Sequence, residues 1–229
     1  MNTLVFIIFL CYFKYGEDNM LEELEKEYQK MQLKYGDKTL DSITFGGCKD
    51  HPDICFVFMN PTGKNYASNK EWKGIKSPWV GTKNIWNLFY QIGTLDKKTY
   101  EKIQKIKGSE WTESFAEDVY KEIENKKVFI TNLAKCTQLD ARPLKDEVYK
   151  KYLDLFYKEM NIVKPKKIIL FGNQVSSIVL NQKISVSTTR KQEFYYNNYH
   201  FYPVFYPVGN GIFNMDKAIE DIKYIIKQQ

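Results

Sequence analysis

The sequence contains little arginine. Of the 34 Lys and Arg residues in this 229-residue chain, only Arg142 and Arg190 are arginine. Bidentate guanidinium contacts, which match carboxylate and phosphate geometry, therefore cannot be the main recognition device of this protein. The 34 basic and 28 acidic side chains leave a formal net charge of +6. This mild excess of lysine permits a polyanionic partner such as nucleic acid but does not by itself indicate one.

Cysteine and histidine are also scarce, and they are scattered. The chain has four cysteines without a C-x-x-C pair and two histidines that lie far apart: Cys11, Cys48, Cys55, Cys136, His51 and His200. This arrangement suits neither a zinc site nor a disulfide framework, so it predicts a reducing, intracellular and cytoplasmic location. A chain of this length can bury a sizeable core without the support of zinc or disulfide bonds.

Several familiar catalytic and phosphate-binding patterns are absent as well. The sequence has no G-x-x-x-x-G-K-[ST], no G-x-G-x-x-G, no G-x-S-x-G and no H-E-x-x-H. It therefore lacks the usual signatures of a P-loop nucleotide site, a dinucleotide site, a hydrolase nucleophile elbow and a zinc-protease helix. No linker, repeat or low-complexity tract interrupts the chain, which predicts one domain.

The longest apolar run at the start of the chain is too short to span a bilayer. Leu4–Phe13 has ten residues, whereas a membrane-spanning helix needs about 20. No basic residue precedes this run and no small-residue cleavage site follows it before Gly16, so it is a poor signal peptide. Two explanations stay open for residues 1–19: a mis-assigned start codon, with the extension untranslated or flexible, or a short membrane-surface anchor. The first is favoured, and we expect no membrane partner.

Strands and helices alternate along residues 20–229, which predicts a single α/β domain with a mainly parallel sheet. Short apolar runs predict buried strands at 54–59, 128–131, 167–171 and one or two within 184–206. Apolar residues at helical spacing predict helices over 20–35, 82–92, 145–162, 173–180 and 215–226, with one or two more within 97–125. In the helix over 145–162 the inward face is expected to hold Val148, Tyr152, Leu155 and Phe156.

Three loops with unusual residues follow predicted strands. They are Asn60-Pro61-Thr62-Gly63, the segment 132–138, and the segment 206–211. In open α/β sheets, ligands bind beyond the carboxyl ends of the strands. The sequence therefore predicts that the functional site lies where these three loops meet.

Three motifs around these loops resemble one known family. The segments are VFMNPTGKN (57–65), SPWVGTKNIWNLF (77–89) and ITNLAKCTQ (130–138). Their order and spacing resemble the uracil-DNA glycosylase superfamily over roughly residues 45–225. In that superfamily the first motif is a strand followed by a turn with Asp or Asn before a proline. The second supplies an aromatic stacking platform, and the third supplies an asparagine that reads a flipped base. The resemblance implies a single-domain, three-layer α/β/α fold.

The resemblance also implies roles for residues in each motif. Asn60 would hold the attacking water by hydrogen bonding, because an amide cannot accept a proton as a carboxylate does. Trp79 would stack on the flipped base, with Met59 also in the base pocket. Asn132 would read the edge of the base, since an amide offers both a donor and an acceptor. Ordinary structural roles stay open: a turn cap for Asn60, a core position for Trp79 and the end of a strand for Asn132.

Two features depart from the superfamily's pattern. A His-Pro pair is common where this chain has Tyr206-Pro207, so Tyr206 becomes the candidate donor to the departing base. Several branches carry an iron–sulfur cluster with a ligand where Cys136 stands, but the other ligand cysteines are missing here. A single cysteine cannot hold such a cluster, so we predict no cofactor and no metal.

DNA contacts are expected around the same loops. Lys64, Lys83 and Lys135 stand beside them in sequence and are candidates for phosphate contacts, the alternative for each being an ordinary solvated lysine. Asn210 lies between Gly209 and Gly211, in a flexible loop that would wedge into the duplex.

The resemblance therefore predicts a monomeric DNA glycosylase that hydrolyses the N-glycosidic bond of uracil, or another deaminated base, and so initiates base-excision repair. The main alternative is a non-catalytic damaged-DNA-binding module that keeps the base pocket. A third possibility is an α/β nucleotide-binding protein unrelated to DNA.

Overall fold

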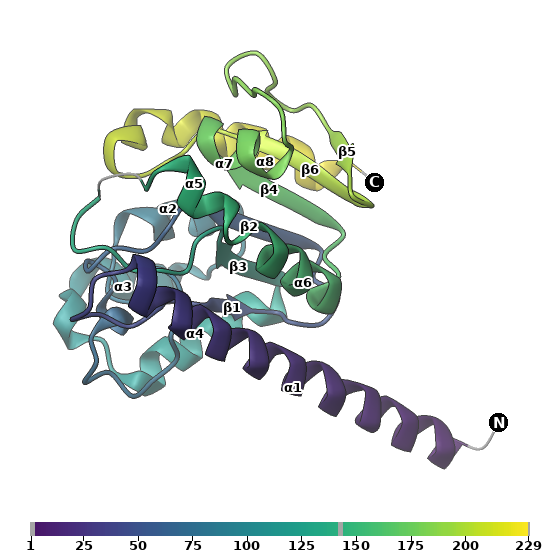
Figure 1. The fold of residues 1–229 in the computed structure, drawn as a ribbon. Coiled ribbons are helices and arrows are strands. Elements are labelled where there is room, and N and C mark those ends of the chain that lie inside the picture. Colours follow the sequence, from purple (N-terminus) through teal and green to yellow (C-terminus); the bar gives the residue numbers. More distant parts are fainter. Residues whose placement is uncertain (1–2, 142–143, 229) are drawn as a thin grey trace.

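The computed structural model describes residues 3–141 and 144–228, with side chains described from residue 19 onward. Within this part of the chain, a six-stranded sheet has the order β1-β3-β2-β4-β6-β5 (Figure 1). The strands are β1 (Phe45–Gly47), β2 (Ile54–Phe58), β3 (Val128–Asn132), β4 (Lys167–Phe171), β5 (Phe194–Tyr196) and β6 (Tyr199–Val204). Strands β3, β2, β4 and β6 run parallel, while β1 and β5 pair antiparallel at the two edges.

Helices cover both faces of the sheet. They are α1 (Thr3–Tyr35), α2 (Asn84–Gln91), α3 (Lys97–Lys105), α4 (Glu113–Asn125), α5 (Asp146–Lys150), α6 (Leu153–Val163), α7 (Asn173–Val179) and α8 (Met215–Lys227). One buried cluster joins α2, α3, α4 and α8 to the sheet, and a second joins α1, α5, α6 and α7 to its other face. The predicted α/β fold with a mainly parallel sheet is therefore confirmed.

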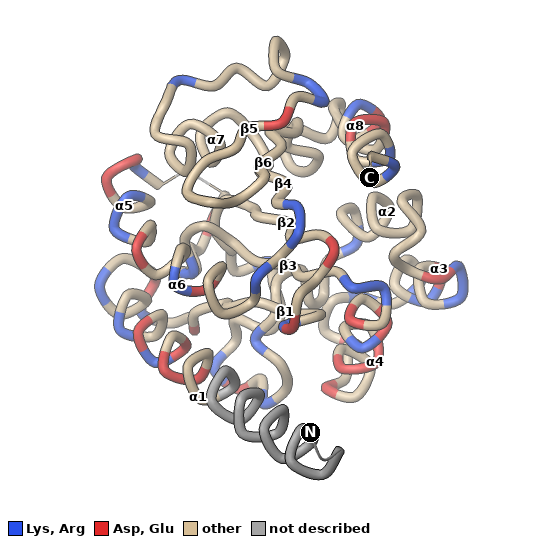
Figure 2. Tube along the Cα trace, turned by 90° about the vertical axis from the view of Figure 1, so that its right-hand side faces the viewer, with Lys and Arg blue, Asp and Glu red and all other residues tan. Residues whose placement is uncertain are grey.

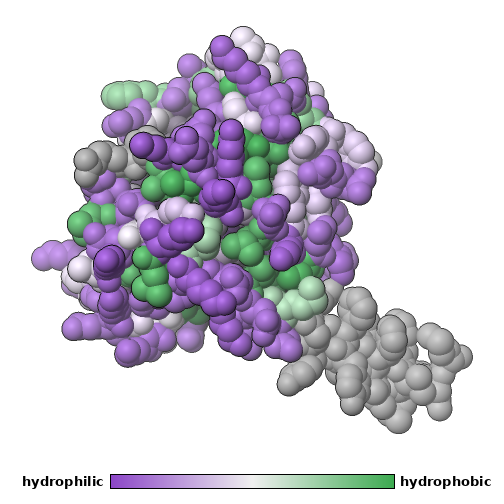
Figure 3. All heavy atoms as spheres, viewed as in Figure 1, coloured by the Kyte–Doolittle hydropathy of each residue, from purple (hydrophilic) through white to green (hydrophobic). Residues whose placement is uncertain are grey.

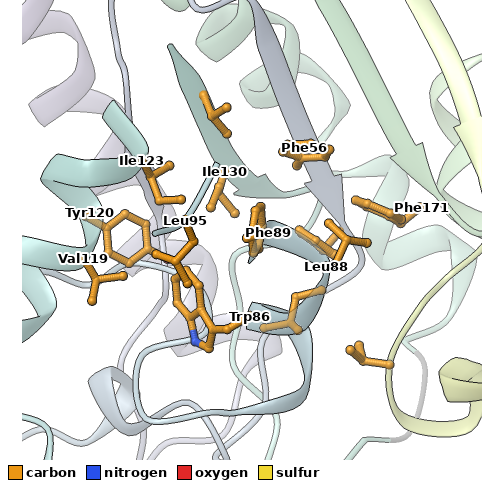
Figure 4. Packing of buried hydrophobic residues seen from close by; sticks show 14 of the residues in the cluster. Phe56, Trp86, Leu88, Phe89, Leu95, Val119, Tyr120, Ile123, Ile130 and Phe171 are labelled. Atoms are coloured by element: carbon orange, nitrogen blue, oxygen red, sulfur yellow. The ribbon is translucent and has the colours of Figure 1, made fainter. Parts of the chain in front are cut away.

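Strand β2 shows why its sequence is apolar throughout. Phe56 and Phe58 point into the cluster on the α2 side, whereas Cys55 and Val57 point into the cluster on the α6 side. Successive side chains alternate between the two faces of a strand, so a strand covered on both faces needs apolar residues at every position. Figure 4 shows Phe56 packed near Phe89 on the α2 side.

The first helix is longer than predicted. The helix expected over 20–35 begins at Thr3, and Leu21, Leu24 and Tyr28 are buried where it packs on the body. The side chains of residues 3–18 lie outside the described part, as do residues 1–2, so the alternatives for residues 1–19 stay predictions. Among the described residues, no helix has the length and apolar character to cross a membrane.

The helix predicted over 145–162 differs from the structure, because it is divided into α5 and α6. In agreement with the prediction, the region 97–125 contains two helices, α3 and α4, and the region 184–206 contains two strands, β5 and β6. Strand β1 was not predicted, because its three residues include two glycines and carry no apolar run. Along helices α1, α3 and α8, acidic and basic residues are interspersed (Figure 2). The face in Figure 3 is largely hydrophilic, with separate apolar patches.

Candidate active site

A cavity of about 590 Å³ lies at the carboxyl ends of the parallel strands. The predicted loops meet there because those ends share one edge of the sheet. The residues that line it include every predicted site residue except Lys135: Met59, Asn60, Lys64, Trp79, Lys83, Asn132, Tyr206, Gly209, Asn210 and Gly211. The structure therefore brings together segments that are up to about 150 residues apart in sequence.

Asn60 has hydrogen-bond partners at both ends of its amide. It lies just beyond β2, where its Nδ2 donates to the Pro61 carbonyl oxygen at 3.1 Å. Its Oδ1 accepts a hydrogen bond of 2.6 Å from the Tyr149 hydroxyl. The turn is tied to the neighbouring loop, since Gln138 N–H donates to the Pro61 carbonyl. Asn60 thus caps its turn locally and still lines the cavity.

Tyr149 was not predicted as a site residue. It shares a helix face with the expected inward residues Tyr152 and Phe156, at i+3 and i+7, and none of its surface is exposed. Burial raises the pKa of the Tyr149 hydroxyl, so the hydroxyl stays protonated and acts as a donor. The helical pattern is thus compatible with burial of Tyr149, but it could not reveal that the hydroxyl meets Asn60, which lies beyond another element.

Asn132 is the last residue of β3 and is only 2% exposed. Its Nδ2 is buried and has no hydrogen-bond partner among the described residues. A buried donor without a partner costs about 1–3 kcal/mol. Because Asn132 lines the cavity, this amide can recover that cost by donating to an acceptor on a bound ligand.

The prediction that Lys135 contacts DNA phosphates is wrong. Lys135 is completely buried and forms an ion pair of 3.0 Å with Glu159, which is also fully buried. Its ammonium further donates to Thr131 Oγ1 and to the backbone carbonyl of Asn132. A buried cation needs such partners, and all of them lie inside the protein. Lys135 therefore supports the end of β3 from behind the site.

Trp79 is held in a conformation that is rare for a bulky residue, with φ of 70°. Its carbonyl accepts hydrogen bonds from Thr82 N–H (3.1 Å), Thr82 Oγ1 (2.7 Å) and Trp86 Nε1 (3.3 Å). Such a strained backbone persists only where its surroundings hold it. The half-buried ring lines the cavity and also packs on the core, so it combines features of both expected roles.

An aromatic cluster supports this wall of the cavity. The Phe58 ring packs edge-to-face against Trp79, with 4.9 Å between the ring centroids, and edge-to-face against Tyr206, with 6.4 Å between the centroids. On another side Phe58 stacks on Phe171 at 4.3 Å. These contacts fix the planes of two cavity residues through one buried ring. Burial raises the pKa of Tyr206 to about 12, so its hydroxyl remains a donor at neutral pH.

The segment after Tyr206 was predicted to be a loop, but Gly209–Asn214 form a short 3-10 helix, which carries an exposed apolar side chain. Gly209 and Asn210 are exposed, and a Cβ at Gly211 would collide with the Tyr206 carbonyl oxygen at 2.1 Å. In the same segment Phe213 is 92% exposed. Phe213 was not predicted as a site residue, because an isolated phenylalanine before a helix is ordinarily part of a core.

The two remaining lysines differ. Lys64 is exposed at the cavity, whereas the Lys83 ammonium donates to the Gln104 carbonyl oxygen at 2.7 Å. The described cysteines Cys48, Cys55 and Cys136 are free and buried. Among the described residues, no cluster of His, Cys, Asp or Glu could hold a metal ion.

Sequence comparison identifies the family. The profile of the uracil DNA glycosylase superfamily matches residues 45–222, which include all the loops that form the cavity. A search of curated proteins found no significant match. Proteins of this superfamily act on DNA, and the match supports a DNA glycosylase-like function. Because the matched region covers well over half of the sequence, the chain belongs to the uracil DNA glycosylase superfamily.

Proposed function

We propose that this protein is a DNA glycosylase that hydrolyses the N-glycosidic bond of uracil, or of another deaminated base, and so initiates base-excision repair. The observation that carries the proposal is the cavity, because it gathers Asn60, Trp79, Asn132 and Tyr206 at the carboxyl edge of the sheet. Each supplies one element that this reaction needs: a water-binding amide, an aromatic face, a base-reading amide and a phenolic donor.

Asn132 and Trp79 form the base-binding part of the proposal. The unpartnered Nδ2 of Asn132 suits the O4 acceptor of uracil, and its Oδ1 suits the N3–H donor. Cytosine reverses both groups, so the same amide orientation would oppose it. Stacking of the base on Trp79 contributes about 1–3 kcal/mol, and Met59 completes the lining beside it.

Bond cleavage needs a placed water and a stabilised leaving group. The bond from the sugar C1′ to the base nitrogen breaks, its electron pair stays with the base, and water attacks the oxocarbenium-like sugar. Asn60 orients this water through the free positions of its amide, and the proton of the water passes to solvent. The Tyr206 hydroxyl, whose pKa is raised to about 12, donates a hydrogen bond to the developing base anion.

DNA binding is proposed to involve the exposed groups around the cavity. Lys64 and Lys83, which both line the cavity, offer positive charge to phosphates, and such contacts position the duplex without reading its sequence. Gly209, Asn210 and Gly211 begin the short 3-10 helix that enters the duplex. Phe213 follows in the same helix, and an exposed apolar side chain of this kind can fill the space left by a flipped base. Such filling offsets the few kcal/mol needed to unstack the base.

The proposal is tested with end-labelled duplexes that carry U·G, U·A or hypoxanthine·T, with a T·A duplex as control. Each duplex is incubated with the protein, and abasic sites are cleaved with alkali. Strand scission at a lesion, absent from the control duplex, supports the enzyme. Tight binding to lesion duplexes without any abasic product would instead favour the non-catalytic module, for which the replacement of a histidine by Tyr206 is the supporting observation.

A further inference from the structure

The hydroxyl of the buried Tyr149 side chain contacts the carboxamide of Asn60. The hydroxyl oxygen and Asn60 Oδ1 are 2.6 Å apart, a short distance for a bond between two neutral groups. Tyr149 has no exposed surface, so water does not compete for this hydrogen bond. The two residues are far apart in sequence and come from different elements, α5 and the turn after β2.

The hydrogen-bonding positions of the Asn60 side chain that remain unused can be counted. A carboxamide has two N–H donors and two oxygen lone pairs. One N–H is used by the Pro61 carbonyl, and one lone pair is used by Tyr149. One N–H and one lone pair are therefore left for a ligand at the cavity. Rotating the amide by 180° would set Oδ1 against the Pro61 carbonyl and Nδ2 against the Tyr149 hydroxyl.

The direction of the Tyr149 hydrogen bond is also determined. The Pro61 carbonyl accepts only from Nδ2, so the atom facing Tyr149 is Oδ1, which carries no hydrogen. The Tyr149 hydroxyl must therefore be the donor. As a result, the oxygen of Asn60 is committed as an acceptor.

We propose that Tyr149 is a positioning residue that locks the Asn60 carboxamide in one orientation, with a single N–H and a single lone pair presented to the cavity. The orientation follows from the contacts alone. Its consequence for catalysis rests on the proposed function, because the water held by Asn60 would lose its fixed position without Tyr149.

The test compares Tyr149→Phe with Tyr199→Phe. Tyr199 also donates to an asparagine at 2.6 Å, Asn161 Oδ1, but neither residue lines the cavity, so it is a matched control. Both substitutions keep the ring and remove only the hydroxyl. The thermal midpoint of each variant shows that the fold is kept.

The first readout does not depend on activity. The Asn60 side-chain amide signals are assigned in ¹⁵N spectra by their loss in Asn60→Ala. In Tyr149→Phe we expect the order parameter of this amide to fall from a rigid value to below about 0.6, with no change in Tyr199→Phe. An unchanged order parameter of the Asn60 amide in Tyr149→Phe would overturn the proposal, even if the protein had no glycosylase activity.

The second readout is the single-turnover rate on a U·G duplex. Tyr149→Phe should lower this rate about tenfold, the effect of losing one positioning hydrogen bond, with duplex affinity unchanged. In an Asn60→Ala background the same substitution should cost nothing more, because Tyr149 acts through Asn60. Equal losses in both backgrounds would show a general structural role and contradict the inference. An inactive wild type would instead count against the proposed function.

Discussion

Two neighbouring strands of the sheet each have an asparagine at or just beyond their carboxyl end, and the two side chains differ in their hydrogen bonding. Beyond β2, Asn60 has partners for both its amide nitrogen and its oxygen. At the end of β3, Asn132 has a buried amide nitrogen without a partner among the described residues, while its backbone carbonyl is held by Lys135. The first side chain is held in place before any ligand arrives. The second has a rigid backbone and a side chain that still needs an acceptor.

This difference matches the two roles proposed for them. A water molecule is small and mobile, so the group that orients it must itself be fixed. A base is large and brings its own acceptors, so the group that reads it can remain unpaired until the base binds. An unpaired buried donor also discriminates against a base that offers no acceptor.

The largest expected effect comes from removing the support behind β3. Lys135→Met leaves the buried carboxylate of Glu159 without its cation, and we expect it to lower the free energy of unfolding by about 3–5 kcal/mol. The matched control is Lys76→Met, because Lys76 pairs with Asp41 at 2.9 Å near the surface. That change should cost about 1 kcal/mol or less. Urea unfolding of both variants measures the difference, and equal losses would contradict a special role for the buried pair.

Asn132→Asp tests the base-reading amide. The substitution replaces the Nδ2 donor by a carboxylate oxygen, which repels O4 of uracil. We expect the single-turnover rate on U·G duplex to fall about 100-fold. A variant that retains the wild-type rate would remove Asn132 from the base-reading role, provided that its thermal midpoint is close to that of the wild type.

Asn132→Leu separates ligand binding from stability. Leucine has a similar size and leaves no polar atom unpaired, so the free energy of unfolding should rise by about 1 kcal/mol while uracil excision is lost. The corresponding change at the β2 end, Asn60→Leu, should lower stability, because it leaves the buried Tyr149 hydroxyl without its acceptor. If both variants were destabilised equally, the contrast between the two asparagines would be wrong.

The smallest effect concerns the pH dependence of stability. The pKa of Tyr206 rises from 10 to about 12 on folding, so between these values the folded protein keeps a proton that the unfolded chain releases. Stability contributed by this group is therefore complete below pH 10 and is lost as pH rises toward 12. Tyr206→Phe should make the decline in unfolding free energy over that range shallower. An identical decline in both proteins would show that Tyr206 is not shielded from water.

Local sequence predicted much of this molecule. The apolar runs at 54–59 and 128–131 predicted strands β2 and β3 to within one residue, because burial on both faces leaves a continuous signal. Strand β1 was missed because Gly46 and Gly47 carry no side chains that could mark it. The motif residues Asn60, Trp79 and Asn132 line one cavity, and their roles there stay predictions.

Interactions between distant segments could not be predicted in the same way. Lys135 looks like a surface lysine until Glu159, on α6, is placed beside it. Tyr149 looks like one more buried aromatic residue of its helix until Asn60, beyond β2, is placed beside its hydroxyl. In both cases the decisive partner comes from another element, and a local pattern contains no information about such a partner.

Asn60 is proposed to support the chemical step without being needed to bind DNA. This role is tested by the single-turnover rate of Asn60→Ala on a U·G duplex, measured together with duplex affinity. The control is Asn161→Ala, which removes another asparagine that accepts a tyrosine hydroxyl at 2.6 Å. We predict that Asn60→Ala loses at least about 100-fold in rate at unchanged affinity, while Asn161→Ala keeps both. A rate for Asn60→Ala close to that of the wild type would contradict the proposed role of Asn60 in the chemical step.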